Sequence, residues 1–219
     1  VSQVMNDQDF QQVTKAFARN GTWYTPTLTV QFNWRLTPEK TVSALINDVD
    51  GKLDQRNLYI PHALRERWKT LFDGKKNETP FDWTAQVKKG ISEFRAMYKE
   101  GVGVLAGTDN EGPLIYPGFS LHDELELMVK EGGLTPFEAL QSATKNPPYF
   151  FNMQEEIGTI EEGRIADFVL LTANPLENIS NTKKIDSVVL NGQYLSHLKL
   201  KSLLKTAKEN TKRKRKSEK

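Results

Sequence analysis

The chain has 219 residues, of which 37% are hydrophobic and 26% charged, and it contains no cysteine. Residues 201–219 carry nine Lys or Arg and two Glu, a net +7 within a total of +2, which leaves −5 for the other 200 residues. These totals exclude disulfides and thiolate metal sites. They predict neither a nucleic-acid partner nor a membrane partner, because the body is acidic and no apolar run approaches the ~18–20 residues of a bilayer span.

The first predicted unit is a helix followed by a strand. Residues 7–19 repeat apolar side chains at helical spacing, with Asp7 or Asp9 as the expected N-cap and Asn20-Gly21 as the stop. The run TWYTPTLTV at 22–30 is rich in β-branched and aromatic residues, which favours a strand.

A long irregular excursion follows at residues 31–80, with short helices expected around 38–48 and 61–72. Loops of this length are usually lids or binding loops when they have no structure of their own. Residues 82–100 then carry an apolar stripe at helical spacing and lead into a predicted strand at 102–107. The order strand, excursion, helix, strand predicts a parallel crossover connection.

Two further helices are expected, 120–132 with Ser120 as N-cap and 135–145 with Thr135 before a proline, ended by PPYFF. From residue 157 onward, short strands alternate with glycine turns at Gly158, Gly163 and Asn191-Gly192, which is typical of antiparallel hairpins. The chain is therefore divided into an α/β portion (1–155), a β portion (156–198) and a helical to disordered basic tail (199–219).

The stretch GVGVLAGTD at 101–109 places Asp109 at the tip of the last predicted parallel strand. One interpretation is structural, because aspartate commonly starts a turn and Gly112-Pro113 follows closely. The other is chemical. A carboxylate fixed at a strand end is a hard ligand for Zn²⁺ and can pass a proton from water to a leaving group. In α/β barrels this end of the strands carries the chemistry.

Four segments in the same order carry a resemblance to a known family: GVGVLAGTD, LHDELELMVKEGGLTPFEALQSATKNPPYFF, IGTIEEGRIADFVLLTANPLENI and IDSVVLNGQYL. They resemble the C-terminal half of metal-dependent amidohydrolases, in the imidazolonepropionase-like and Xaa-Pro dipeptidase-like (prolidase) branch. The resemblance runs from about residue 8 to 195. It implies an α/β fold, the C-terminal portion of a TIM-like (β/α)8 barrel over 1–155, and part of a small β-sandwich over 156–198.

The resemblance also implies roles for individual residues. Asp109 corresponds to the aspartate of the closing barrel strand, which contacts the metal and shuttles protons. The turn Glu161-Glu162-Gly163 is interpreted as structural, as is Asp167, which we expect to cap a turn or to pair with Arg164.

Most of the implied metal ligands are missing from this sequence. The family site needs a His-x-His pair, a carboxylated lysine or acidic residue, and two further histidines, whereas the chain has only His62, His122 and His197. We expect His62 and His197 to be surface residues. His122 opens the helix after the Asp109 loop, where it would touch substrate, orient Asp109, or simply be a solvated first-turn residue.

Only two candidate barrel strands are present, and the sequence begins without Met at Val1-Ser2-Gln3-Val4, which does not resemble a signal peptide. We therefore expect the C-terminal half of a longer hydrolase, unstable or prone to self-association when isolated, with its compartment undetermined. The expected partner is the missing N-terminal half of the barrel or a second copy of the chain.

The resemblance implies a hydrolase acting on C–N bonds of a cyclic amide, an imidazolone or an Xaa-Pro dipeptide. Its expected cofactor is a divalent metal, with Zn as the expected ion, whose bound hydroxide attacks the carbonyl while Asp109 serves as ligand and proton shuttle. The residues expected around the substrate are Thr108, Asn110, His122 and Tyr24, with Thr25 nearby. The alternatives are a catalytically inactive piece whose basic tail binds an anionic partner, and a standalone α/β binding module.

Overall fold

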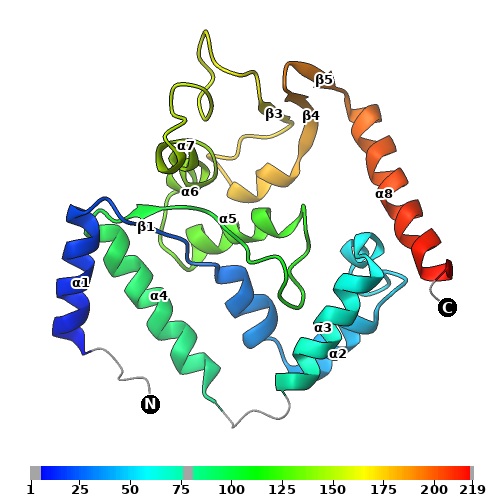
Figure 1. Cartoon of the computed structure of the whole chain (residues 1–219), viewed down its shortest axis with the longest axis horizontal. Coiled ribbons are helices and arrows are strands. Elements are labelled where there is room, and N and C mark those ends of the chain that lie inside the picture. Colours follow the sequence, from blue (N-terminus) through cyan, green and yellow to red (C-terminus); the bar gives the residue numbers. More distant parts are fainter. Residues whose placement is uncertain (1–5, 76–80, 218–219) are drawn as a thin grey trace.

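Two parallel strands lie at the centre of the α/β part. In the computed structural model, which describes residues 6–75 and 81–217, β1 (Trp23–Tyr24) pairs with β2 (Gly103–Val104) in the register Trp23↔Gly103. The helices α1 (Asp7–Arg19) and α4 (Trp83–Lys99) pack together beside them (Figure 1). The predicted parallel crossover is therefore confirmed. Residues 1–5, 76–80 and 218–219, which include the four-residue start and the end of the basic tail, lie outside the described residues.

Both strands are shorter than the sequence predicts. The expected strand 22–30 ends at Tyr24, because Thr27 adopts a left-handed φ of +45° and Leu28 already begins a helical turn. That turn continues into the π-helix η1 (Val30–Arg35). A left-handed β-branched residue is uncommon and interrupts strand geometry, so the carboxyl end of β1 is a tight strand-to-helix turn.

The first helix has the predicted bounds but a different cap. The side chain of Asn6 accepts a hydrogen bond from the Asp9 N–H at 2.9 Å, so Asn6 is the N-cap and neither Asp7 nor Asp9 is. The predicted stop is confirmed, since Asn20 ends the helix and Gly21 has a φ of +63°.

The excursion between β1 and α4 is folded and has its own core. It contains α2 (Glu39–Asn47), the 3₁₀-helix η2 (Gln55–Tyr59) and α3 (His62–Lys75), which confirms the two predicted short helices. Its buried cluster combines these helices with the loop after β2 and consists of Val42, Ile46, Ile60, Trp68, Phe72, Leu114 and Tyr116. The segment is therefore packed against the loop that follows Asp109.

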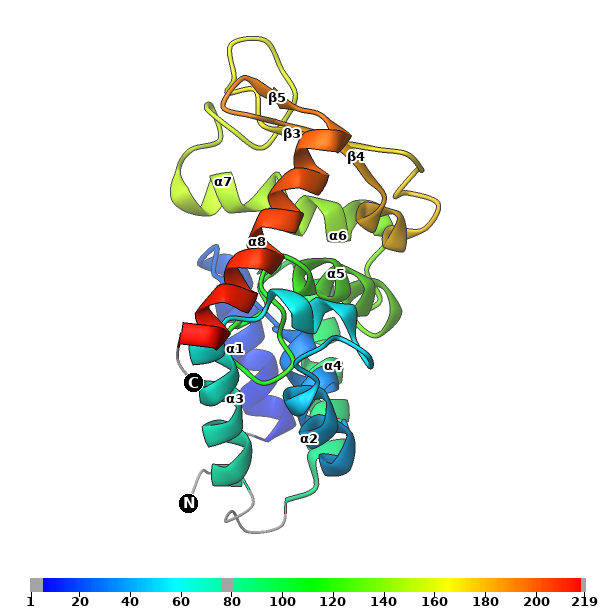
Figure 2. The ribbon, with the colours of Figure 1, turned by 90° about the vertical axis from the view of Figure 1, so that its right-hand side faces the viewer.

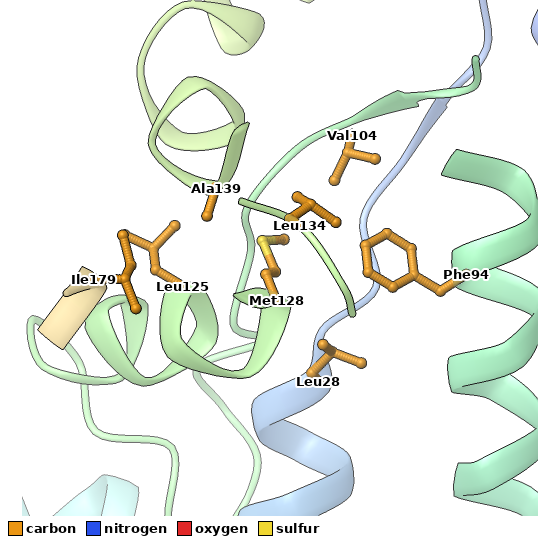
Figure 3. Close-up of a cluster of buried hydrophobic side chains, with 8 residues drawn as sticks. All are labelled: Leu28, Phe94, Val104, Leu125, Met128, Leu134, Ala139 and Ile179. Atoms are coloured by element: carbon orange, nitrogen blue, oxygen red, sulfur yellow. The ribbon is translucent and has the colours of Figure 1, made fainter. Parts of the chain in front are cut away.

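The main core lies between α4, α5 (Ser120–Lys130) and α6 (Pro136–Ala143), beside the two strands (Figure 3). Its buried members are Leu28, Phe94, Val104, Leu125, Met128, Leu134, Ala139 and Ile179. The apolar stripe predicted for residues 82–100 supplies Phe94, which is fully buried. Burial of such side chains is the dominant favourable contribution to folding.

Two expectations about the later helices need correction. Ser120 does not cap α5, since its hydroxyl accepts the Tyr116 N–H at 2.8 Å within the preceding loop. The PPYFF segment does not simply end the helix before it but lies within a further short helix, α7 (Asn146–Phe151). The predicted start of α6 is confirmed, because Thr135 and Glu138 form a reciprocal capping box.

The β part is a three-stranded antiparallel sheet in the order β3-β4-β5, formed by β3 (Phe168–Leu171), β4 (Ile185–Leu190) and β5 (Gln193–Leu195). The 3₁₀-helix η3 (Ile179–Lys183) precedes β4 and packs on α5. The predicted hairpin turn at Asn191-Gly192 is confirmed, both residues having positive φ. The expected β-sandwich stays a prediction, because the described residues show this one sheet.

Within this part the expected pairing of Asp167 with Arg164 is wrong. Arg164 pairs with Glu161 at 3.0 Å, whereas the Asp167 carboxylate accepts the backbone N–H of Asn191. Asp167 therefore caps the hairpin turn, which was the other expectation. This hydrogen bond joins the residue before β3 to the turn between β4 and β5, so the role of Asp167 is structural.

The last element, α8 (His197–Ser217), runs from the β3–β5 sheet past η2 to α3 (Figure 2). The helix predicted for the start of the tail therefore extends through much of the basic run. None of the helices in the described ranges is both long and apolar enough to cross a bilayer.

Candidate functional site

The two sides of the β1–β2 pair differ sharply. The Tyr24 ring packs against Phe94 of α4, with ring centroids 5.9 Å apart, and Val104 is buried in the same core. A Cβ on Gly103 would lie 2.5 Å from the Trp23 ring, and one on Gly107 would lie 2.6 Å from Thr25 Cγ2. Because side chains alternate along a strand, Trp23 and Thr25 share the side that faces away from the helices.

This arrangement argues against the expected contact of Tyr24 with substrate. Its side chain is directed to the helix-packed side, where burial and the nearby carboxylates of Glu93 and Glu124 raise the pKa of its phenol. Thr25, which the sequence also placed near the substrate, is exposed on the opposite side of the strands, next to Gly107.

Asp109 lies five residues beyond the paired part of β2 and is exposed. Its φ is +50°, a left-handed conformation that aspartate tolerates better than most residues. The turn that follows uses its backbone, because the Asp109 carbonyl accepts the Gly112 N–H at 3.2 Å. Within the described residues the Asp109 carboxylate makes no hydrogen bond or ion pair. Turn formation thus accounts for the backbone of Asp109 and leaves its carboxylate free for chemistry.

The residues beside Asp109 are held by the helical segment after β1. The carbonyl of Thr108 accepts the Thr29 hydroxyl at 3.4 Å, and the Leu114 carbonyl accepts Asn33 Nδ2 at 3.4 Å. Asn110 is exposed beside the aspartate. The structure therefore brings Thr108, Asp109 and Asn110 together at one tip, as their adjacency in the sequence requires.

Sequence reasoning missed Glu124, which is fully buried on α5. Its two carboxylate oxygens accept the backbone N–H groups of Leu28 at 2.8 Å and Thr29 at 2.7 Å. Burial raises the pKa of Glu124, although these N–H groups and the Thr29 hydroxyl oppose the shift. Its position in the helix could have indicated this burial, because Glu124 shares the core-facing side of α5 with Leu125 and Met128. A glutamate on such a side needs a partner, since glutamate is rarely fully buried without one.

His122 points toward the β part. Its Nδ1 lies 3.0 Å from the Thr182 hydroxyl of η3, and that hydroxyl donates to the Ile179 carbonyl at 2.9 Å. Burial, followed by the positive charge of Lys183, lowers the pKa of His122. His122 is thus hydrogen-bonded to η3, whereas the sequence left three roles open: contact with substrate, orientation of Asp109, or a solvated first-turn residue.

The other two histidines lie elsewhere. His62 Nδ1 is 3.5 Å from the Glu66 carboxylate one turn along α3, and His197 is exposed at the start of α8. His197 is exposed at the surface, as expected. The His62 side chain is 38% exposed, so it is partly accessible at the surface.

A chain of ion pairs, also missed by sequence reasoning, joins three parts of the fold. Arg56 of η2 pairs with Asp54 at 2.7 Å and with Asp123 of α5 at 2.5 Å. Lys183 of η3 then pairs with Asp123 at 2.8 Å and Glu126 at 2.6 Å. These partly buried charges fix the excursion and the β part against α5, the helix that begins after the Asp109 loop.

The described residues provide one candidate metal ligand and not a complete site. Across residues 6–75 and 81–217, no group of three or more His, Asp or Glu side chains converges as a metal site would require. The free carboxylate of Asp109 is a suitable hard oxygen donor for a zinc-type ion. Within the described residues, Asp109 therefore does not belong to a group of three or more such side chains.

Comparison with known families gives a match over most of the chain. A family model described as "Amidohydrolase family" matches residues 3–195. Among curated proteins, ochratoxinase of Aspergillus niger is 37% identical over 90 residues, covering 41% of this chain and 18% of that protein. Imidazolonepropionase of Desulfotalea psychrophila is 33% identical over 89 residues, covering 39% of this chain and 20% of that protein.

Solved structures resemble the chain over nearly its whole length. A bottromycin amidohydrolase aligns with a TM-score of 0.63 and 19% identity, covering 95% of this chain and 45% of that one. A Xaa-Pro dipeptidase with bound methionine aligns with a TM-score of 0.55 and 22% identity, covering 88% and 38%. The fold is thus mixed α/β and corresponds to part of these barrel structures. The chain spans less than half the length of each relative.

Proposed function

Because the chain belongs to the amidohydrolase family, we propose that it forms the C-terminal portion of a TIM-barrel hydrolase that cleaves a C–N bond. Residues 1–155 would supply its last barrel strands, and residues 156–198 part of a β-sandwich beside the barrel. The complete hydrolase, in this proposal, is the polypeptide or assembly that joins this chain to the remaining barrel strands. Those strands would come from a further segment or from a second copy.

One observation carries the proposal: the Asp109 carboxylate is exposed five residues beyond the carboxyl end of the parallel strand β2 and has no hydrogen-bond or ion-pair partner among the described residues. In α/β barrels, residues at this end of the strands carry the chemistry. The surrounding contacts of Thr108 and Leu114 hold the backbone of the tip in place. A fixed carboxylate without a protein partner is suited to binding a cation or accepting a proton.

In the proposed reaction, water adds to an amide carbonyl and the C–N bond breaks. A divalent ion such as zinc, when bound, supplies the activation of water at neutral pH. Asp109 would contact that ion, accept the proton that water loses as the new C–O bond forms, and deliver it to the nitrogen that leaves. Thr108, Asn110 and Thr25 would line the rim around this carboxylate.

The substrate we propose is a small molecule with one amide-type C–N bond. Supporting this class, the relatives include an imidazolonepropionase and a Xaa-Pro dipeptidase by name. We propose a cyclic amide, an imidazolone or an Xaa-Pro dipeptide, each of which places a carbonyl next to the nitrogen that leaves.

The test is the variant Asp109→Asn in the complete hydrolase, assayed on an Xaa-Pro dipeptide and on an imidazolone. Loss of general-acid and general-base function reduces turnover on the order of 10²–10⁴-fold. Asp50→Asn is the matched control, because Asp50 is also an exposed turn aspartate. Equal turnover in the two variants would refute the role of Asp109.

A second candidate function is anion binding by α8. Lys201, Lys205, Lys208 and Lys212 recur at a spacing that places them on one side of this helix. Such a stripe would bind a polyanion through charge, and the chain would then serve as a binding module. Heparin-column retention of the chain should fall when these four lysines are replaced by alanine, and unchanged retention would remove this candidate.

A further inference from the structure

The helical segment after β1 is capped from a distant part of the chain. Leu28 and Thr29 open this segment, and the first N–H groups of a helix have no partner within it. Glu124, 95 residues after Thr29, accepts both N–H groups, at 2.8 and 2.7 Å. A carboxylate at a helix N-terminus also interacts favourably with the helix dipole.

The same segment also holds the loop that carries Asp109. The Thr29 hydroxyl, which adjoins the Glu124 carboxylate, donates to the carbonyl of Thr108 at 3.4 Å. One turn further on, Asn33 Nδ2 donates to the Leu114 carbonyl at 3.4 Å. Leu114 is buried and has a φ of +63°, so this loop needs outside contacts to keep its shape.

These contacts connect the chain on both sides of Asp109, the candidate catalytic residue, to Thr29. The chain leaves Thr108, passes Asp109 and the loop to Ser120, and enters α5, where Glu124 returns to Thr29. Both ends of the Asp109 loop are therefore tied to the same residue, Thr29, which is fully buried.

We propose that Glu124 is a positioning residue for Asp109. It fixes the start of the segment 28–35, and that segment in turn orients the loop 108–119. The proposal rests on the function proposed for Asp109 and adds the group that holds it in place. Without the two hydrogen bonds from Leu28 and Thr29, the segment shifts, and its contacts with Thr108 and Leu114 are lost.

Hydrogen–deuterium exchange of the full chain tests this directly. Glu124→Gln keeps the size of the side chain but turns an NH₂ group toward one of the two backbone donors. We expect faster deuterium uptake both in residues 28–35 and in residues 105–118. Glu126→Gln is the matched control on the same helix, because Glu126 pairs with Lys183 and not with the segment after β1. We expect it to leave both peptides unchanged.

Faster uptake confined to residues 28–35 would overturn the proposal, because Glu124 would then be a helix cap and nothing more. If Glu124→Gln raises uptake across the whole chain, Thr29→Val decides. This variant keeps the N–H bond to Glu124 and removes the hydroxyl, which reaches Thr108 and also adjoins the Glu124 carboxylate. We expect it to raise uptake in residues 105–118, and no change there would overturn the proposal.

Kinetics of the complete hydrolase separate this proposal from the function of Asp109. Displacing a catalytic group by about 1 Å can cost on the order of a hundredfold in rate, so Glu124→Gln should lower kcat by that order and leave KM unchanged. If Asp109→Asn retains normal turnover, the proposed function fails, while the exchange experiment still decides whether Glu124 orients the loop.

Discussion

The two sides of the β1–β2 pair give the clearest contrast in the molecule. On one side, Val104 packs with Phe94 and Met128 into a buried core formed with α4, α5 and α6, and the partly buried Tyr24 packs against it. On the other side, Trp23 and Thr25 lie over two glycines and remain partly or fully exposed. The helix-packed side is covered by elements of this chain, whereas the open side is not covered by the described residues.

This contrast agrees with a loop tip that carries Asp109 but, among the described residues, no complete metal site. The side that needs only local helices is buried, since its partners follow each strand in the sequence. The open side ends in Asp109, and in a closed barrel it would face the other strands. In the function proposed above, the open side is the surface that the remaining barrel strands would cover.

The largest effect on stability is expected on the helix-packed side. Phe94 is 0% exposed at the centre of the main core, so Phe94→Ala should lower the free energy of unfolding by about 3–5 kcal/mol. Urea denaturation measures this change. Phe81→Ala is the comparison, because Phe81 is 56% exposed just before α4. A similar loss in both variants would contradict the contrast between the finished core and the surface.

A smaller effect on stability is expected at Gly103, where the Trp23 ring lies close to the backbone on the open side of the strands. A Cβ on Gly103 would lie 2.5 Å from the Trp23 ring, whereas Gly90 of α4 has no atom within 4 Å of such a Cβ. Gly103→Ala should cost about 1–3 kcal/mol through overpacking, while Gly90→Ala should stabilise the helix by up to about 1 kcal/mol. Thermal denaturation measures the change in Tm of each variant. Equal changes in Tm would contradict the close approach of the Trp23 ring to Gly103.

The smallest effect concerns pH and the contact between α5 and η3. The pKa of His122 is lowered in the folded chain by burial and by Lys183, relative to about 6.5 when unfolded. Between the folded pKa and about 6.5, the unfolded chain binds more protons at this position, so stability falls as pH decreases through that range and is constant above about 6.5. His122→Gln should remove this part of the acid dependence. Denaturation on both sides of about pH 6.5 measures it, and an unchanged slope would contradict the buried contact.

Local patterns in the sequence were sufficient to predict much of the scaffold. The helix at residues 7–19, the helix start at Thr135-Pro136 and the hairpin turn at Asn191 depend on residues close together in the chain. The parallel pairing of β1 with β2 followed from the order of elements. The apolar run before Asp109 predicted a strand there, which the structure shows as the shorter β2, ending five residues before Asp109.

The missed features depend on contacts between residues far apart in the sequence. The strand predicted for 22–30 ends early because Glu124 caps a helical segment at Leu28, 96 positions away. The side on which Tyr24 packs was not predictable, since alternation shows that neighbours differ and not which of them is buried. Arg56 joins Asp123 across 67 positions, and no local pattern indicates such a pair.

The most direct test of an unfinished site is the metal content of the purified chain after exhaustive dialysis, measured by elemental mass spectrometry. This chain supplies Asp109 and no converging set of ligands among its described residues. We predict that no zinc or similar ion remains in stoichiometric amount. One tightly held ion per chain would contradict the account, because the chain would then contain a complete metal site by itself.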